Sequence, residues 1–231
     1  MCIRDSINII CIDFDLFMTE HRASRLGRLS WTMFDWANQP FYTLIMTFVF
    51  AVYFSDVFIT GGDGAQKFTL TQTISGILIA ILSPILGSIS DLRGNRKRWM
   101  GFWSVLFVIG MALLWYAYPA APNGIWLVMF GLILASTAVG FGEVFNNSMI
   151  THIETKENMG LLSGLGYGLG YIAGLIGLIL FLILFVWPGG ETNSLYGLNT
   201  SEYEHIRIIG PLCAAWYAFF IIPLFLFTPD T

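Results

Sequence analysis

Two acidic residues in apolar surroundings offer the clearest chemistry in this sequence. Glu143 lies inside an apolar run over 125–147, and Asp35 stands where another apolar run begins. An ionised side chain inside a membrane costs about 3 kcal/mol or more, so it normally faces the interior of a helix bundle or a water-filled cavity. A carboxyl group in such a position can contact a polar substrate, or take up and release a proton.

Amide side chains accompany both acids at helical spacing. Asn147 follows Glu143 by four residues, with Asn146 beside it, and Asn38 follows Asp35 by three. Residues at these spacings share a helix face. Two interpretations stay open for each acid. Glu143 is either a proton-coupling or substrate-contacting group, or a structural partner of basic residues near the same membrane face. Asp35 is either a gating or coupling residue, or an amino-terminal cap favoured by the helix dipole.

Composition indicates which elements must hold these residues. Of the 231 residues, 56% are hydrophobic and only 11% are charged, against roughly a quarter charged in an average soluble domain. So little charge excludes an ordinary soluble enzyme. The aromatic content of 16% excludes a disordered chain, and a net charge of −4 excludes a nucleic-acid partner. The three cysteines form no metal-binding spacing, so we expect neither a metal nor another cofactor. A polytopic membrane protein remains.

Six apolar runs are long enough to cross a membrane as helices, for which about 18 or more residues suffice. The predicted fold is therefore an all-α membrane protein with six transmembrane helices. Of the 11 Lys and Arg residues, all but Lys67 and Arg207 fall on one side of these runs, which places both termini in the cytoplasm. The predicted bundle covers 36–228, with spans at 36–59, 69–90, 99–118, 125–147, 161–187 and 206–228.

The start of the chain fits poorly with this bundle. Residues 1–17 are interrupted by Asp5, Asp13 and Asp15, so they form neither a span nor a signal peptide. We interpret 1–17 as a leader that is non-native or disordered, and 18–35 as a basic cytoplasmic flank.

The loop between the second and third runs carries the most specific motif. A glycine at its start permits close helix approach, an acid can cap the following turn, and a second glycine permits a positive φ. Basic residues after them hold the loop on the cytoplasmic side and can bind lipid phosphates. A plain basic loop would explain the cations alone. The segment resembles the loop signature G-x-x-x-D-x-x-G-x-[RK]-[RK] of the major facilitator superfamily (MFS), in Gly87, Asp91, Gly94, Arg96, Lys97 and Arg98.

A second resemblance points to one branch of that superfamily. DWANQPF over 35–41, followed by TFVFAVYF over 47–54, resembles the opening of the vacuole effluxer-like permeases related to autophagy. SGLGYGLGY over 163–171 resembles another segment of this branch, although Gly168 stands where the branch usually has Ala. The fourth run also lacks the Arg that superfamily members often carry there.

The resemblance implies a secondary transporter that works by alternating access, an effluxer of small solutes that include amino acids. It also implies two six-helix halves, so we expect this chain to be the amino-terminal half, with a carboxy-terminal half missing. The alternatives are a half-transporter that works as a homo- or hetero-oligomer, and a non-transporting scaffold. The candidate substrate or coupling residues are Asp35, Asn38, Glu143, Asn146, Asn147 and Tyr171.

The remaining expectations concern packing, chemistry and place. Gly166, Gly170 and Gly174 recur every four residues and predict close helix contact, within the bundle rather than in a homodimer. No catalytic residue is predicted, because the apolar runs contain no catalytic dyad or metal-ligand cluster. The expected location is the plasma (inner) membrane of a bacterium, or a vacuolar-type membrane in a eukaryote, where lipid surrounds the bundle.

Overall fold

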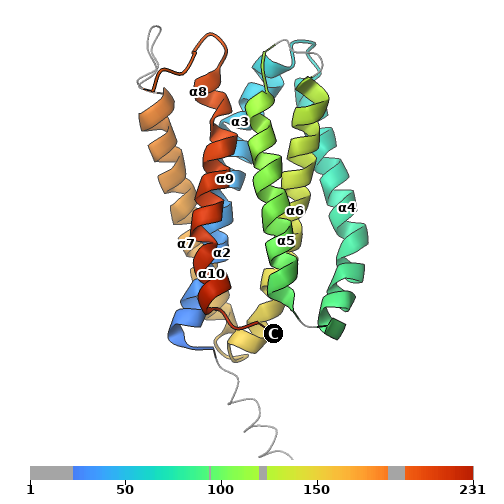
Figure 1. Ribbon diagram of the computed structural model, residues 1–231, viewed down its shortest axis with the longest axis vertical. Helices are drawn as coiled ribbons and strands as arrows, with labels where there is room; N and C mark the ends of the chain where they lie inside the picture. The colour runs from blue at the N-terminus through green and yellow to red at the C-terminus, as the bar shows by residue number, and fades with distance from the viewer. Residues whose placement is uncertain (1–22, 94, 120–123, 187–195, 231) are drawn as a thin grey trace, which may run out of the picture.

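The computed structural model describes residues 23–93, 95–119, 124–186 and 196–230, with the backbone alone for 89–93. These residues form six helical segments, each long and apolar enough to cross a membrane, and no β-strand occurs among them. The segments run up and down in one bundle (Figure 1). The chain is thus an all-α, multi-pass integral membrane protein, as the apolar runs predict. The leader interpretation of 1–17 concerns residues outside the described ranges.

The first membrane segment changes helix type along its length. Its first part, α2, begins after Ser24, whose hydroxyl oxygen accepts the N–H of Gly27 at 3.0 Å and so caps the helix. Two wider, π-helical stretches follow. The parts are α2 (Arg25–Pro40), η1 (Phe41–Phe48), α3 (Phe50–Tyr53) and η2 (Phe54–Phe58).

Because α2 begins at Arg25, one interpretation of Asp35 is wrong. The residues before 36 mix polar with apolar side chains, so hydropathy hides this helix, yet Trp31 and Phe34 are buried in the bundle. Asp35 lies well inside α2, and Ser24 is the residue that caps it. The carboxyl group of Asp35 therefore does not serve as an amino-terminal cap.

Pro40 marks the change from α-helix to π-helix in the first segment. Proline has no N–H, so the carbonyl of Trp36 lacks a donor four residues further on. The indole Nε1 of Trp216, in α9 (Ile209–Phe220), donates to this carbonyl at 3.2 Å, and the two indole rings stack 6.2 Å apart. The sixth segment thus satisfies the backbone group that proline leaves free, as apolar surroundings require.

The other segments pack around the first and fourth. The fourth, α6, contacts α4, α5 and α2, while α7 lies along α2 and α9 along α5. The core is rich in aromatic side chains, among them Phe34, Phe41, Phe107 and Phe141. The remaining elements are α4 (Gly64–Arg93), α5 (Arg96–Leu113), the 3-10 turn η3 (Leu114–Tyr116), α6 (Gly124–Ile153), α7 (Met159–Phe181), the π-helical η4 (Leu182–Val186), α8 (Glu204–Arg207) and α10 (Ile222–Phe227).

One end of the bundle gathers most of the described cations, and we call it the basic end. It holds the start of α2, the α4–α5 and α6–α7 connections and the end of α10 (Figure 1). Arg28 of α2 and Glu154, just after α6, form an ion pair there. The described basic side chains of this end are Arg25, Arg28, Arg96, Lys97, Arg98 and Lys156.

Lys97 joins three elements at the basic end. Its ammonium group donates to the carbonyl of Phe225 at 2.8 Å and to the carbonyl of Thr228. The Thr228 hydroxyl donates in turn to the carbonyl of Gly27 at 3.2 Å. These contacts fasten the end of α10 to the starts of α5 and α2. A cation at this position suits the negative end of a helix dipole.

The loop motif is described only in part. The side chain of Asp91 and the whole of Gly94 lie outside the described residues, and the positive φ of the turn falls on Asn95, at 64°. Asparagine tolerates this conformation better than most residues. A Cβ at Gly87 would meet no described atom within 4 Å, so the close helix approach expected there finds no support in this part of the chain.

Candidate functional site

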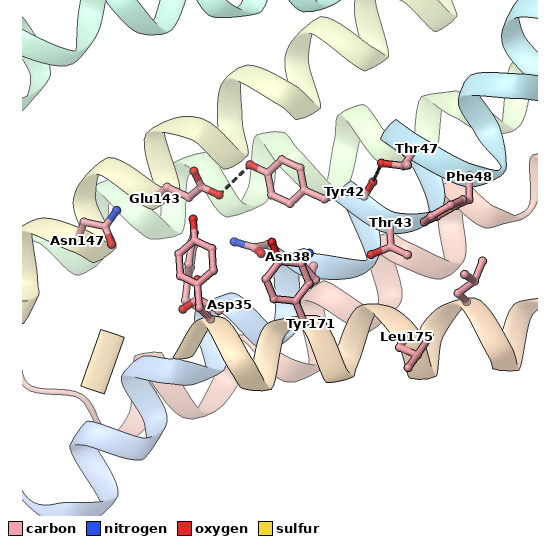
Figure 2. Close-up of a pocket in the computed structure, with 14 residues that line it drawn as sticks. Asp35, Asn38, Tyr42, Thr43, Thr47, Phe48, Glu143, Asn147, Tyr171 and Leu175 are labelled. Carbon is pink, nitrogen blue, oxygen red and sulfur yellow. Dashed lines mark hydrogen bonds between the residues drawn. The ribbon is translucent and has the colours of Figure 1, made fainter. Parts of the chain in front are cut away.

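A cavity of about 590 Å³ lies between the first, fourth and fifth membrane segments (Figure 2). Polar side chains from the first, fourth and fifth segments gather in it. Its described lining residues are Phe34, Asp35, Asn38, Gln39, Tyr42, Thr43, Thr47, Phe48, Glu143, Asn147, Tyr167, Tyr171, Leu175 and Leu178.

The first segment supplies one wall of this cavity. Asp35, Asn38 and Tyr42 lie three and four residues apart, which places them on one face of α2 and the start of η1. Beyond Pro40 the wider π-helical turns carry Thr43 and Thr47 to the same wall. The Thr47 hydroxyl donates to the carbonyl of Tyr42 at 2.8 Å (Figure 2), which satisfies a backbone acceptor in this irregular stretch.

Glu143 enters from α6 and meets the first segment. The phenol of Tyr42 donates to Oε1 of Glu143 at 2.8 Å, and Figure 2 shows this contact across the cavity. Glu143 therefore has a partner from the first segment, not the basic loop partner that one interpretation assigned to it. Lys97 of that loop contacts carbonyls of the sixth segment instead. Glu143 still lines the cavity while it accepts this hydrogen bond. Asn147, one helical turn further along α6, lines the cavity as well.

Asn38 is the most unusual polar group of the site. The residue is only 2% exposed, and its amide nitrogen has no hydrogen-bond partner within the described ranges. Figure 2 shows the amide pointing into the space between the lining residues. A buried donor without a partner costs about 1–3 kcal/mol. The geometry therefore suits a ligand that brings an acceptor oxygen to Asn38.

The glycine stripe of α7 sets the distance between the fifth segment and the first. A Cβ at Gly166 would lie 2.5 Å from Oδ2 of Asp35, and one at Gly170 would lie 3.2 Å from the Asp35 carbonyl oxygen. A Cβ at Gly174 would meet the hydroxyl of Thr43 at closer range still. The structure thus places all three glycines against the first segment, inside the bundle. Without side chains there, α7 comes close enough for its tyrosines to line the cavity.

The structure brings five of the six candidate residues together, and Asn146 is the exception. Asn146 is 1% exposed, and its backbone carbonyl accepts the indole N–H of Trp31 at 2.9 Å, on the side that packs against α2. Successive helical residues point about 100° apart, so Asn146 and Asn147 cannot face the same space. The candidates that line the cavity are Asp35, Asn38, Glu143, Asn147 and Tyr171.

Sequence reasoning missed two tyrosines of the site, although helical spacing could have found both. Tyr42 lies seven residues after Asp35, two turns along the same face. Tyr167 lies four residues before Tyr171, and their ring centroids are 6.2 Å apart. Both spacings are visible in the sequence.

The cavity offers groups for polar contacts and for proton exchange. Two carboxyl groups face it together with phenols, hydroxyls and amides, and no Lys, Arg or His occurs among its described lining residues. No group of three or more His, Cys, Asp or Glu residues that could hold a metal ion occurs in the ranges described. The arrangement can bind a small polar solute and can exchange protons at two acids.

Comparison with known proteins gives one informative match. No protein-family model matches the chain. Over 201 residues the chain is 29% identical to a protein of Bacillus subtilis (strain 168) named as an uncharacterized MFS-type transporter, YxiO. The match covers 84% of this chain and 45% of that protein, so the chain spans about half the length of its relative. The name agrees with the superfamily resemblance of the loop motif. It does not mention the vacuole effluxer branch, which stays a prediction.

Proposed function

We propose that this chain is the amino-terminal six-helix half of a secondary transporter that moves a small polar solute across a membrane by alternating access. The observation that carries the proposal is the cavity, because two half-buried acids and several amide side chains of an apolar bundle line one space large enough for a solute. The relative's name, MFS-type transporter, and its greater length support the same proposal.

The finer parts of the proposal rest on the resemblance of 35–54 and 163–171 to vacuole effluxer-like permeases. These finer parts are that the direction of transport is efflux, that the solutes include amino acids, and that the missing partner is a carboxy-terminal half. The basic end would face the cytoplasm, because Lys and Arg collect on the cytoplasmic side of membrane proteins. The membrane would be the plasma membrane of a bacterium, or a vacuolar-type membrane in a eukaryote.

In this proposal the Tyr42–Glu143 hydrogen bond links solute binding to helix movement. It connects the first and fourth segments across the cavity at 2.8 Å. A solute that takes over either partner would release this connection, so occupied and empty cavities would favour different packings of the two segments. Differential contacts of this kind are what allow a ligand to shift a conformational equilibrium.

Because alternating access needs both halves, the test is solute entry into proteoliposomes that contain the purified chain together with the part of the Bacillus subtilis relative that it does not match. The liposomes are incubated with an equimolar mixture of the twenty common amino acids, and the solutes that enter are quantified by mass spectrometry. We expect saturable uptake by this pair and its loss when the chain carries Glu143→Gln. Glu202→Gln makes the same chemical change at an exposed residue outside the cavity and should transport normally.

Each outcome of this test has a definite meaning. Uptake by the pair no faster than in protein-free liposomes contradicts transport and favours the scaffold alternative. Undiminished uptake by Glu143→Gln removes that residue from the mechanism. Uptake by the chain alone, with cross-linking that detects a dimer in the bilayer, favours a half-transporter that pairs with itself.

A further inference from the structure

The charges of the cavity suggest which chemical group of a solute this chain binds. We propose that the cavity binds a protonated amine, held between Asp35 and Glu143, on a solute that also presents an acceptor oxygen to Asn38. This inference rests on the proposed function, because it names the class of solute bound at the same site. It covers amino acids and amino alcohols and disfavours carboxylic acids that lack an amine.

The described lining of the cavity carries acidic groups without a balancing cation. Asp35 and Glu143 both face the cavity, and no cationic side chain is found among the described residues that line it. Glu143 receives one neutral hydrogen bond, from Tyr42. Charges interact more strongly in such low-dielectric surroundings than in water. A cationic group on the solute therefore supplies the opposite charge that this half lacks, whereas an anionic solute would meet repulsion.

The aromatic lining of the cavity favours an organic cation over a metal ion. Tyr167 and Tyr171 line the α7 side, while Phe34 and Phe48 line the first-segment side. Ammonium groups bind well over aromatic faces. Hard metal ions instead need several oxygen ligands close around them, and a space of about 590 Å³ with two carboxyl groups is a poor match for that.

Asn38 favours a second group on the solute, for a reason that is independent of charge. Its buried amide nitrogen points into the cavity without a partner in the described part of the chain. An amide N–H binds an acceptor, not another donor. A solute with a hydroxyl, carbonyl or carboxylate oxygen near its amine would supply this acceptor. Asn38 and Asp35 lie three residues apart on one helix face, so an amine and an oxygen on neighbouring carbons could reach both.

The experiment measures charge selection inside the cavity with a thiol. Asn147→Cys places the thiol one turn from Glu143, at an exposed position of the lining, in a chain whose native cysteines are replaced by Ala. Its rate of modification is compared for two reagents of similar size, the cationic trimethylammonioethyl methanethiosulfonate and the anionic sulfonatoethyl methanethiosulfonate. Thr151→Cys, one turn further along α6 and outside the cavity lining, is the matched control.

We expect the ratio of cationic to anionic rates to fall by about tenfold when Glu143→Gln is added to Asn147→Cys, as one unit charge nearby would cause. Asp35→Asn should lower the same ratio, and neither change should alter the ratio at Thr151→Cys. A ratio at Asn147→Cys that both neutralising changes leave unaltered overturns the proposal. Circular dichroism and size-exclusion chromatography confirm that each variant is folded.

The same thiol then reports on the class of solute. L-leucine methyl ester keeps the amine and blocks the carboxylate, whereas N-acetyl-L-leucine blocks the amine and keeps the carboxylate. Both retain a carbonyl oxygen. We expect the ester and leucine itself to slow modification of Asn147→Cys by an uncharged reagent, N-ethylmaleimide, and the acetyl compound to have no effect. Protection by N-acetyl-L-leucine, or by none of the three, overturns the proposal.

These measurements separate the inference from the proposed function because they need no flux. They are made on the full chain in detergent micelles, where both membrane faces are accessible. Cation selection without proteoliposome uptake would contradict transport and leave the amine site standing. Uptake of anionic solutes without cation selection would contradict the amine site and leave transport standing.

Discussion

Adding one methyl group to the glycine stripe of α7 should test how the fifth segment meets the first. The change is Gly174→Ala, and the matched control is Gly168→Ala on the same helix. A Cβ at Gly174 would lie 2.9 Å from Cγ of Gln39 and would also meet the Thr43 hydroxyl, whereas a Cβ at Gly168 would have nothing within 4 Å. Rotation of the Thr43 side chain about χ1 would relieve this contact little, because the hydroxyl and methyl groups of a β-branched residue fill two of the three staggered positions.

The expected magnitudes follow from two effects. Replacing glycine by alanine in a helix interior is worth about 0.5–1 kcal/mol of stabilisation, and both variants gain it. Gly168→Ala should therefore be more stable than the wild-type chain. Gly174→Ala must also push two packed helices apart, and overpacking of this kind costs about 1–3 kcal/mol. The propensity effect cancels between the two variants, so their free energies of unfolding should differ by about 1–3 kcal/mol.

The assay is unfolding in mixed micelles by increasing sodium dodecyl sulfate, followed by circular dichroism at 222 nm. Gly168→Ala should move the midpoint to higher detergent, and Gly174→Ala should move it to lower detergent. A midpoint that shifts equally in both variants would refute the reasoning, because the space around the two positions would then make no difference to the packing.

Three further predictions concern contacts away from the glycine stripe. Trp216→Phe removes the donor to the Trp36 carbonyl and should lower the free energy of unfolding by about 1–3 kcal/mol in the same titration. Trp126→Phe, at a residue 74% exposed, should change this free energy little. Equal losses in the two variants would contradict the prediction. Lys97→Met removes the ammonium group that binds the end of α10, so amide hydrogen exchange over 222–227 should become faster; unchanged exchange there would count against the contact. The hydrogen bond from Lys67 lowers the pKa of Asp63, so its small stabilisation is present at neutral pH and is lost as the pH falls through that lowered pKa. Lys67→Gln should return the pKa of Asp63 to its ordinary range in a carboxyl NMR titration, and an unmoved titration would show that the pair has no such effect.

The six segments could be predicted because a span must be apolar along its whole length to lie in lipid. The start of α2 could not be predicted this way. Arg25, Arg28 and Asp35 lower the hydropathy of its first turns, although Trp31 and Phe34 of the same turns are buried. A helix that is only partly apolar escapes a hydropathy window, and the cap at Ser24 identifies its start only once the structure is known.

The site could be predicted in part. Glu143 and Asp35 were identifiable because a charge in an apolar segment needs a special place. The sequence could not say that Glu143 would pair with Tyr42, because that depends on how α2 and α6 are rotated about their own axes. The same rotation separates Asn147, in the cavity, from Asn146, which packs beside Trp31. Sequence spacing places residues on a face of one helix, and tertiary packing decides which neighbour that face meets.

The stacked indoles of Trp36 and Trp216 make the contact between the first and sixth segments visible to light. Their rings lie 6.2 Å apart with planes 18° from parallel, and one indole N–H is bound to a carbonyl. Two aromatic transitions held this close couple to each other, so the pair should contribute a signal to near-ultraviolet circular dichroism that neither indole gives alone. The chain therefore carries an intrinsic optical probe of this helix pair, which needs no added label and can be followed while solutes are titrated into the cavity.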